Sequence, residues 1–166
     1  MRTQPALNAF HVIKASSYIS EESEAGEKID FVPHEWFDFS ENPWAVRKDE
    51  PEKKIYINSE RWRHPSTKYA PVEALVLVNG FVHPGKERLF TLNARAKTIL
   101  VKYDGICCEC KLEDTGNYQV ISLPKSIDPK AKIPIEIEIQ DSYPGSTYDD
   151  IVISGIFYLD AELRTE

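Results

Sequence analysis

The stretch IPIEIEIQ at residues 133–140 places an isoleucine at every second position from 133 to 139. Glu136 and Glu138 lie between the last three of these isoleucines. In an extended chain successive side chains point to opposite faces, so this stretch would have one apolar face and one charged face. The pattern predicts a β-strand with one face buried.

Seven other stretches show similar short apolar runs, and helical periodicity hardly appears in the chain. They are AFHVIKAS (9–16), KKIYIN (53–58), VEALVLVNGF (72–81), KTILVKY (97–103), ICCECKL (106–112), YQVISL (118–123) and DIVISGIFYL (150–159). Separators such as NGFVHPGK and EDTGN supply the Gly, Pro, Asn and Asp residues that turns require. We therefore expect an all-β protein of about eight strands, folded as an antiparallel β-sandwich of the jelly-roll kind.

A chain of 166 residues is long enough to bury the core of one domain and short for two domains. We expect a single domain over 1–166, with its core at about 9–160 and tails at 1–8 and 161–166. One architecture should then account for nearly the whole sequence.

Residues 17–52 break the rhythm of the strands with an acidic stretch followed by aromatic residues among Pro, Asn and Asp. We expect one long irregular loop there, with at most a single helical turn. Trp36, Phe37 and Trp44 are the side chains expected to pack this loop.

The chain has 20 basic and 27 acidic residues, which gives a net charge of −7. Such a chain repels phosphate backbones and anionic lipid surfaces, so nucleic acid is not an expected partner. No stretch reaches the roughly 18 apolar residues that a membrane helix needs, and we expect no membrane insertion. The opening MRTQPALNAF has neither the basic cluster nor the apolar run of a signal peptide.

The three cysteines, Cys107, Cys108 and Cys110, are clustered in one predicted strand. Neighbours on a strand face opposite ways, and zinc sites usually space their thiolates two to four residues apart on a turn. Cys108 and Cys110 share a face but lie too far apart on a strand for an easy disulfide. We expect structural thiols.

No catalytic motif is visible in the sequence. There is no Gly-x-Ser-x-Gly elbow and no Gly-rich phosphate loop, and none of His11, His34, His64 and His83 lies in a motif that would supply a base. We therefore expect that the protein is not an enzyme.

The turn YPGSTYDD at 143–150 combines a Tyr-Pro-Gly turn at Gly145 with two adjacent acids. Because Asp149 and Asp150 enter a strand, their side chains should face opposite ways and cannot converge on one atom. We expect one of them to accept backbone N–H bonds across the turn, and the other to face solvent or the binding loops. Tyr143 either stacks on a sugar or caps the core with its hydroxyl in water.

The stretch NSERWRHPSTKY at 58–69 contains Arg61, Trp62 and His64 just after a predicted strand. Sugars lay their C–H faces on aromatic rings and pair their hydroxyls with planar donors and acceptors. This mixture predicts a sugar-binding loop. The alternative is that Trp62 plugs the core while the arginines extend into solvent.

The motif YPGSTYDDIVISGI at 143–156 closely resembles the closing motif of NADase-type glycan-binding domains, within the discoidin or galactose-binding-domain-like superfamily. Further pieces follow in the same order, and the resemblance extends over about 9–160. They are KASSYISE, FDFSENPWAV, LVLVNGF, LNARAKTILVKYDG, LEDTGNYQVISL and IPIEIEIQDSYPGSTYDD. The resemblance implies a jelly-roll module of a bacterial envelope or exported protein, with sugars bound on loops at one end.

The resemblance also implies a role for Asn79, Asn93 and Arg95, which match its Asn-Gly-Tyr and Asn-x-Arg-x-Lys pieces. On an extended segment Asn93, Arg95 and Lys97 would share one face, as in a platform for a polar ligand. Alternatively, these side chains bond neighbouring strands and acids at the edge of the sandwich.

Similar sandwiches often hold a structural calcium ion, to which a Glu in the final strand contributes a carboxylate. This chain has Gly155 at that place, so one oxygen ligand is missing. Asp38 and Asn42 remain as candidate ligands, whereas calcium prefers six to eight oxygens. The loop with NPWAV, around Trp44, is also shorter than the resemblance leads us to expect.

The sequence thus predicts a non-catalytic carbohydrate-binding module whose partner is a glycan or another polar small ligand. The alternative is a protein-interaction or assembly domain on the same discoidin-like sandwich. In both cases the resemblance implies an extracellular, periplasmic or cell-envelope location.

Overall fold

The alternating stretch that begins at residue 133 forms most of strand β11 (Pro134–Tyr143) in the computed structural model of the protein. The structure describes residues 8–59, 71–128 and 130–160. In β11 the side chains of Ile135, Ile137 and Ile139 are buried, as the alternation predicts.

The glutamates of β11 point outward to two lysines on the neighbouring strands. Lys54 lies 3.4 Å from the Glu138 carboxylate, and Lys102 lies 3.3 Å from that of Glu136. The charged face of the strand is therefore neutralised by its neighbours.

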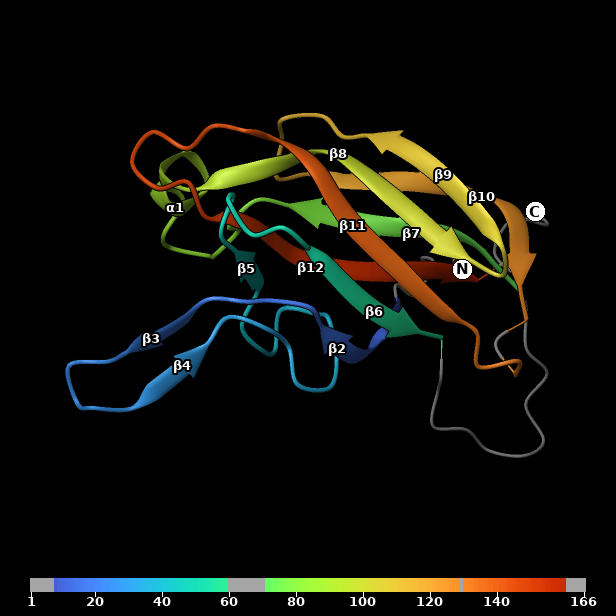
Figure 1. Cartoon of the computed structure of the whole chain (residues 1–166), viewed down its shortest axis with the longest axis horizontal. Coiled ribbons are helices and arrows are strands. Elements are labelled where there is room, and N and C mark those ends of the chain that lie inside the picture. The colour runs from blue at the N-terminus through green and yellow to red at the C-terminus, as the bar shows by residue number, and fades with distance from the viewer. Residues whose placement is uncertain (1–7, 60–70, 129, 161–166) are drawn as a thin grey trace, which may run out of the picture.

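The strands form two layers of a β-sandwich (Figure 1). One layer contains, in spatial order, β9 (Ile106–Lys111), β8 (Ala94–Tyr103), β11, β6 (Lys54–Asn58) and β2 (His11–Ala15). The other contains β10 (Tyr118–Ile127), β7 (Val72–Asn79) and β12 (Ile151–Asp160), with β1 (Asn8–Ala9) and β5 (Trp44–Val46) paired to β12. The pairing is antiparallel apart from one short contact, which confirms the predicted antiparallel sandwich.

That short contact joins the layers. Ile151 and Val152, at the start of β12, pair in parallel with Ala94 and Arg95 at the start of β8. The inner faces of the two layers enclose one main hydrophobic cluster, in which Trp44 is fully buried. The Trp44 indole N–H also donates to the carbonyl of Ser17 at 3.0 Å.

All eight predicted strands are present, and segment 17–52 is more ordered than expected. It contains β5 and a hairpin of β3 (Ser20–Glu22) and β4 (Lys28–Asp30). A short helix, α1 (Arg88–Leu92), was not predicted. Strands of three residues and a helix of five are too short to show a period in the sequence.

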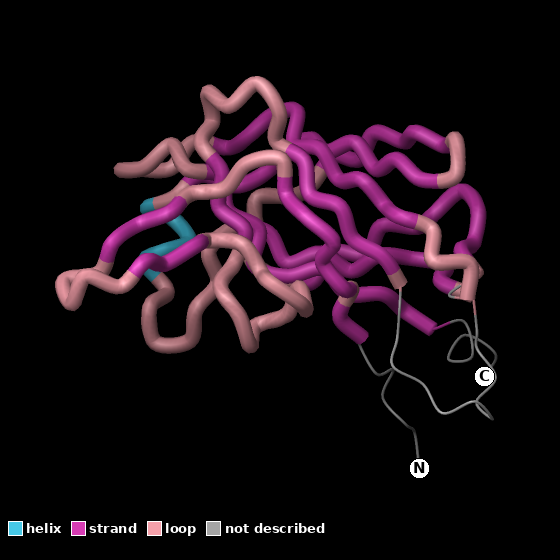
Figure 2. The backbone as a smooth tube through the Cα atoms, turned by 60° about the horizontal axis from the view of Figure 1, so that its bottom comes forward, coloured by secondary structure: helices cyan, strands magenta, loops and turns pink. Residues whose placement is uncertain are grey.

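The β3–β4 hairpin, α1 and the turn after β11 lie at the same end of the molecule, on the left in Figures 1 and 2. The opposite end carries the β8–β9 turn. In the described part of the chain, no helix is long and apolar enough to cross a membrane.

Candidate binding site

Backbone hydrogen bonds attach the β3–β4 hairpin to β5. The N–H of Ile19 donates to the carbonyl of Ala45 at 2.8 Å, and the N–H of Ala45 donates to the carbonyl of Phe31 at 2.9 Å. Ala45 is in turn opposite Val152 in the pairing of β5 with β12. Four residues that are distant in the sequence therefore lie side by side: Ile19, Phe31, Ala45 and Val152.

The turn at 144–150 is held against the end of α1. The N–H of Tyr148 donates to the carbonyl of Leu92 at 2.9 Å, and the N–H of Ala94 donates to the carbonyl of Asp150 at 3.0 Å. The position of the Tyr148 side chain therefore depends on the backbone of α1 and the residues that follow it.

Gly145 is required for this close approach. A Cβ atom at Gly145 would lie 2.6 Å from the carbonyl oxygen of Leu92 and would also overlap the carbonyl oxygen of Tyr148. Real Cβ atoms essentially never come so near to a backbone oxygen, so the turn can pack here only with glycine. Gly145 thus allows the turn to pack closely against the end of α1.

Arg95 connects the same turn to two other loops. Its Nε and Nη2 atoms donate to the two carboxylate oxygens of Asp114 at 2.8 and 2.9 Å. Its Nη1 atom donates to the carbonyls of Asn93 and Pro144 at 3.0 and 3.2 Å. The hydrogen bond from Arg95 lowers the pKa of the Asp114 carboxyl below its usual range.

Asn79 has an equally complete set of partners inside the sandwich. Its side chain is fully buried, and its Nδ2 atom donates to the carbonyl of Ala96 at 2.7 Å. Its Oδ1 atom accepts from the N–H groups of Gly80 and Ala96, each at 3.0 Å. Asn79 and Arg95 thus bond neighbouring strands, loops and an acid, and their contact with a ligand stays a prediction.

A pocket opens between the hairpin, α1 and the turn at 144–150, and we call it the loop-end pocket. Its volume is about 280 Å³. It is lined by Ile19, Glu21, Phe31, Ala45, Phe81, Leu89, Asn93, Tyr148, Asp150 and Val152.

Aromatic rings form much of the wall of the loop-end pocket. The ring centroids of Phe31 and Phe81 are 6.4 Å apart with an interplanar angle of 67°. Tyr148 is 51% exposed and lies at the side of the pocket formed by the turn. A ligand could therefore contact aromatic surface from more than one direction.

Asn93 is the one predicted ligand residue that the described structure places in this pocket. Its side chain is only 9% exposed, and its Nδ2 atom donates to the carbonyl of Leu89 at 2.9 Å. No donor among the described residues reaches its Oδ1 atom, which remains available as an acceptor.

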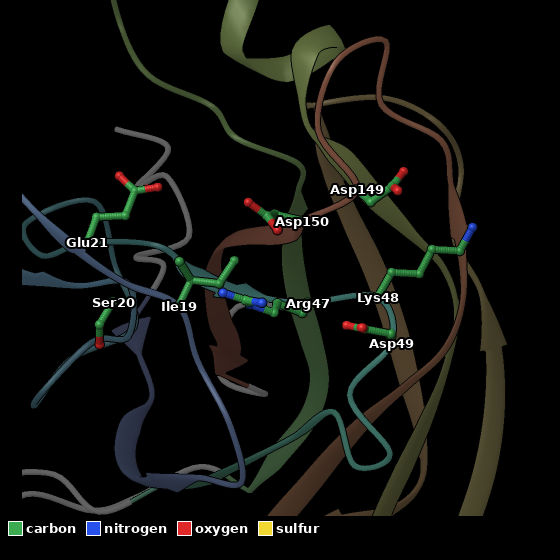
Figure 3. A pocket seen from close by; sticks show the side chains of 8 residues that line it. All are labelled: Ile19, Ser20, Glu21, Arg47, Lys48, Asp49, Asp149 and Asp150. Atoms are coloured by element: carbon green, nitrogen blue, oxygen red, sulfur yellow. The ribbon is translucent and has the colours of Figure 1, made fainter.

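A second, more open depression of about 640 Å³ adjoins the loop-end pocket, and we call it the charged cleft (Figure 3). It is lined by Ile19, Ser20, Glu21, Arg47, Lys48, Asp49, Asp149 and Asp150. Ile19, Glu21 and Asp150 belong to both depressions, so a ligand larger than one ring could extend from one into the other.

Asp150 lies at the boundary between the two depressions. Burial raises the pKa of its carboxyl, the nearby Arg47 guanidinium lowers this pKa, and the neighbouring charge of Asp149 raises it further. Figure 3 shows the carboxylates of Asp149 and Asp150 pointing in different directions, so they do not converge on one atom. Neither carboxylate accepts a hydrogen bond from the described residues, and the expected backbone N–H bonds to one of them are not found there.

Tyr143 lies outside both depressions. Its hydroxyl donates to the carbonyl of Leu112 at 2.8 Å, and the Nζ atom of Lys97 lies 5.5 Å from the centroid of its ring. The side chain thus caps one edge of the core, with its hydroxyl bonded to backbone. Sugar stacking on Tyr143 stays a prediction. The other predicted binding residues, Arg61, Trp62 and His64, lie outside the described residues.

The predicted calcium ligands do not form a cage of oxygen atoms. The Oδ1 atom of Asp38 accepts from the backbone N–H of Ser40 at 2.8 Å and also from its hydroxyl. Asn42 donates through Nδ2 to the carbonyl of Asp30 at 3.1 Å. Within the described residues no group of three or more His, Cys, Asp or Glu side chains could hold a metal ion. Calcium binding at Asp38 and Asn42 stays a prediction.

The three cysteines lie on β9, and all of them are free thiols. Cys107 is exposed, whereas Cys108 and Cys110 are half-buried against the core. Burial raises the pKa of the Cys110 thiol to about 11, so it stays protonated at neutral pH. These properties are those of structural thiols.

Sequence reasoning missed Ile19, Phe31, Phe81 and Tyr148 as parts of a site. Each belongs to a different segment, and only the fold brings them together around the loop-end pocket. Two signals could have drawn attention to them: Phe81 follows Asn79 and Gly80 in the stretch that matches the Asn-Gly-Tyr piece, and Tyr148 is an aromatic residue in a turn.

Comparison with known protein families matches residues 64–159 to a family described as the NAD glycohydrolase translocation F5/8 type C domain. Comparisons with curated proteins and with solved structures gave no match. The matched residues include α1, the turn at 144–150 and all of β7 to β11. Because the match covers more than half of the chain, the protein belongs to the NAD glycohydrolase translocation F5/8 type C domain family, a family of discoidin-like β-sandwiches.

Proposed function

We propose that this protein is a non-catalytic carbohydrate-binding module that holds a sugar in the loop-end pocket. The family is one of discoidin-like binding or translocation modules, and carbohydrate is our proposal for what this member binds. The observation that carries the proposal is the combination of aromatic rings and free oxygen acceptors in one small pocket.

Sugars require both surfaces at once. Their C–H faces lie on aromatic rings, and their hydroxyls need acceptors and donors placed around the ring. The loop-end pocket offers Tyr148 and Phe81 as aromatic surface and Asp150, Glu21 and Asn93 as acceptors. Its volume of about 280 Å³ suits a single sugar ring, with the charged cleft available for a second.

Affinity for a single sugar should be weak, in the micromolar to millimolar range. A shallow polar site recovers little free energy beyond the cost of fixing the ligand and desolvating its hydroxyls. The family's description as a translocation domain supports an exported parent protein, and we propose that the module acts outside the cytoplasm.

A glycan array tests the proposal. We expect the parent domain to bind a defined set of glycans, and we expect Tyr148→Ala to lose at least about tenfold in apparent affinity because the stacking surface is removed. Tyr118→Ala is the matched control, since Tyr118 is 56% exposed and lies on β10, whereas Tyr148 is 51% exposed. Equal binding by the parent and by Tyr148→Ala would place the sugar elsewhere, and Trp62→Ala would then test the predicted loop.

A second candidate function is self-assembly through the edge strand β10. Tyr118 and Val120 on this strand are 56% and 58% exposed, and they flank the apolar residues Val76, Val78 and Phe157. Among the described strands β10 pairs only with β7, so no described strand covers its other edge. An exposed apolar edge strand is a template for pairing with another chain.

The occupant we propose for this edge is a second copy of the chain. The segment 118–122 carries no charge, so two copies could pair there without like-charge repulsion despite the net charge of −7. Light scattering should then show a concentration-dependent dimer, which Val120→Lys would abolish. Ile13→Lys, at a residue 46% exposed on β2, is the control. A monomer at all concentrations would reject this function.

A further inference from the structure

We propose that the part of the ligand that enters the loop-end pocket carries a positive charge, in the form of an ammonium or alkylated ammonium group. The inference rests on the proposed function, because it assumes that this pocket binds a ligand. It adds the chemical class of the group that the pocket selects.

The charge of the pocket lining is one-sided. Glu21 and Asp150 contribute two carboxylates, and the lining contains no Lys, Arg or His. A ligand that carries phosphate or carboxylate would meet repulsion from both acids. A cation would be attracted by both.

Among the described residues these two carboxylates have no ion-pair or hydrogen-bond partner, although the charge of Arg47 in the adjoining charged cleft acts on Asp150. By contrast, Asp114 is paired with Arg95 at 2.8 Å. Burying a carboxylate without a partner is costly, and a ligand cation would remove that cost at Asp150.

The aromatic rings favour the same kind of ligand. A cation is attracted to the face of an aromatic ring when it lies within about 6 Å of the ring centroid. Phe31 and Phe81 stand at 67° to each other, and Tyr148 adds a third ring at the exposed side. Aromatic walls that enclose a volume next to carboxylates are the surroundings in which proteins bind ammonium groups.

Asn93 is an independent indication of a hydrogen-bond donor in the ligand. The side chain is nine-tenths buried, its Nδ2 atom is bonded to Leu89, and its Oδ1 atom has no donor among the described residues. A primary ammonium group, as in an amino sugar, supplies three N–H donors from one atom, so it could satisfy Asn93, Glu21 and Asp150 together. A trimethylammonium group has no N–H donor and would use only its charge and the aromatic rings. A neutral hydroxyl supplies one donor and brings no positive charge to the acids.

The test uses two pairs of small probes, each with a cationic and a neutral member. The members of the choline pair have closely similar shapes, whereas N-acetylglucosamine also carries an acetyl group. Glucosamine is compared with N-acetylglucosamine, and choline is compared with 3,3-dimethylbutan-1-ol, its neutral analogue. Each is titrated into the purified full chain while amide chemical shifts around Asn93 and Tyr148 are followed by NMR. We expect the cationic member of at least one pair to bind about tenfold more tightly than the neutral member.

Two variants show whether the acid at the pocket is responsible. Asp150→Asn should reduce the preference for the cationic probe to about threefold or less, because one of two carboxylates is removed. Asp149→Asn changes the neighbouring carboxylate, which points in a different direction in Figure 3, and should keep the preference. The probe pair that shows the preference identifies the cationic group of the ligand: the glucosamine pair indicates an amino sugar, and the choline pair indicates a trimethylammonium group.

Three outcomes would overturn the inference. Equal binding of charged and neutral probes in the pocket would leave the proposed function standing and reject the cation. If none of the four probes binds but glycans on the array bind and depend on Tyr148, the proposed function likewise stands and the cation is rejected. Silence from all four probes together with a silent array would reject both the cation and the proposed function.

Discussion

At the scale of single residues, the polar side chains that look most like ligand contacts divide into two groups. The side chain of Asn79 forms hydrogen bonds with the protein backbone, and that of Arg95 with the backbone and with Asp114. These bonds hold the loops in place. Asn93 and Asp150 keep oxygen atoms available at the loop-end pocket. The spacing of residues in the sequence cannot make this distinction, because it depends on which carbonyls the fold brings near.

The Arg95–Asp114 pair gives a stability prediction with a defined pH dependence. The pKa of Asp114 is lowered in the folded protein from the ordinary 3.8, so the pair stabilises the fold above that pH and this contribution is lost as the pH falls through the folded-state pKa. Asp114→Asn should cost about 1 kcal/mol at pH 7, a modest value because the Asp114 side chain is 39% exposed.

Urea unfolding over a series of pH values from 7 into the acid range would measure this effect. The difference between parent and Asp114→Asn should be present at pH 7 and shrink as the pH falls through the folded-state pKa of the parent carboxyl. Asp149→Asn is the control, since that carboxylate has no hydrogen bond among the described residues, and it should change stability by less than about 0.5 kcal/mol. An equal loss at all of these pH values would show that the charge of Asp114 is not the cause.

At the scale of elements, the sandwich could be predicted and the site could not. The strand at 133–140 could be predicted from its alternating apolar and charged residues, because one of its faces is buried and the other meets water. The strands β3, β4 and β5 have three residues each, which is too few for a period. Yet β3, β5 and the residues Ile19 and Phe31 at the two ends of the hairpin supply one wall of the loop-end pocket. The pocket exists only because backbone bonds join Ile19, Phe31 and Ala45, and such long-range contacts leave no local pattern.

The turn at 144–150 is the element on which binding should depend most. Gly145→Ala would introduce a Cβ atom 2.6 Å from the carbonyl oxygen of Leu92, so the turn must move away from α1. We expect a loss of about 1–3 kcal/mol in the free energy of unfolding, together with a loss of glycan binding as Tyr148 shifts.

The control for this turn is Gly85→Ala. A Cβ atom at Gly85 meets nothing within 4 Å, although its φ of +80° disfavours alanine by about 1 kcal/mol. This variant should therefore lose some stability and keep its binding. Chemical denaturation and the glycan array would be measured on both variants, and unchanged binding by Gly145→Ala would show that the turn does not set the position of Tyr148.

At the scale of the whole molecule, the family match and the folding unit do not coincide. The match begins at residue 64, whereas β2, β5 and β6 precede it. The earlier part of the chain supplies β6, which pairs with the central strand β11, and β5, which pairs with β12. It also supplies five of the largest fully buried side chains, namely Phe10, Phe37, Trp44, Ile55 and Ile57.

We therefore predict that a fragment of residues 64–166 does not fold by itself. Without β6 one edge of β11 loses its ladder, and without Trp44 and Phe37 the inner faces of both layers are left open to water. The wall of the loop-end pocket formed by Ile19, Phe31 and Ala45 would also be missing. Circular dichroism of this fragment should show no cooperative unfolding transition, and its amide NMR spectrum should show poor chemical-shift dispersion. Mixing this fragment with residues 1–63 should restore both the transition and binding, because the two pieces together contain the complete core. A fragment of 64–166 that unfolds cooperatively alone would mean that the matched region carries a sufficient core, and that the preceding strands serve the pocket rather than the fold.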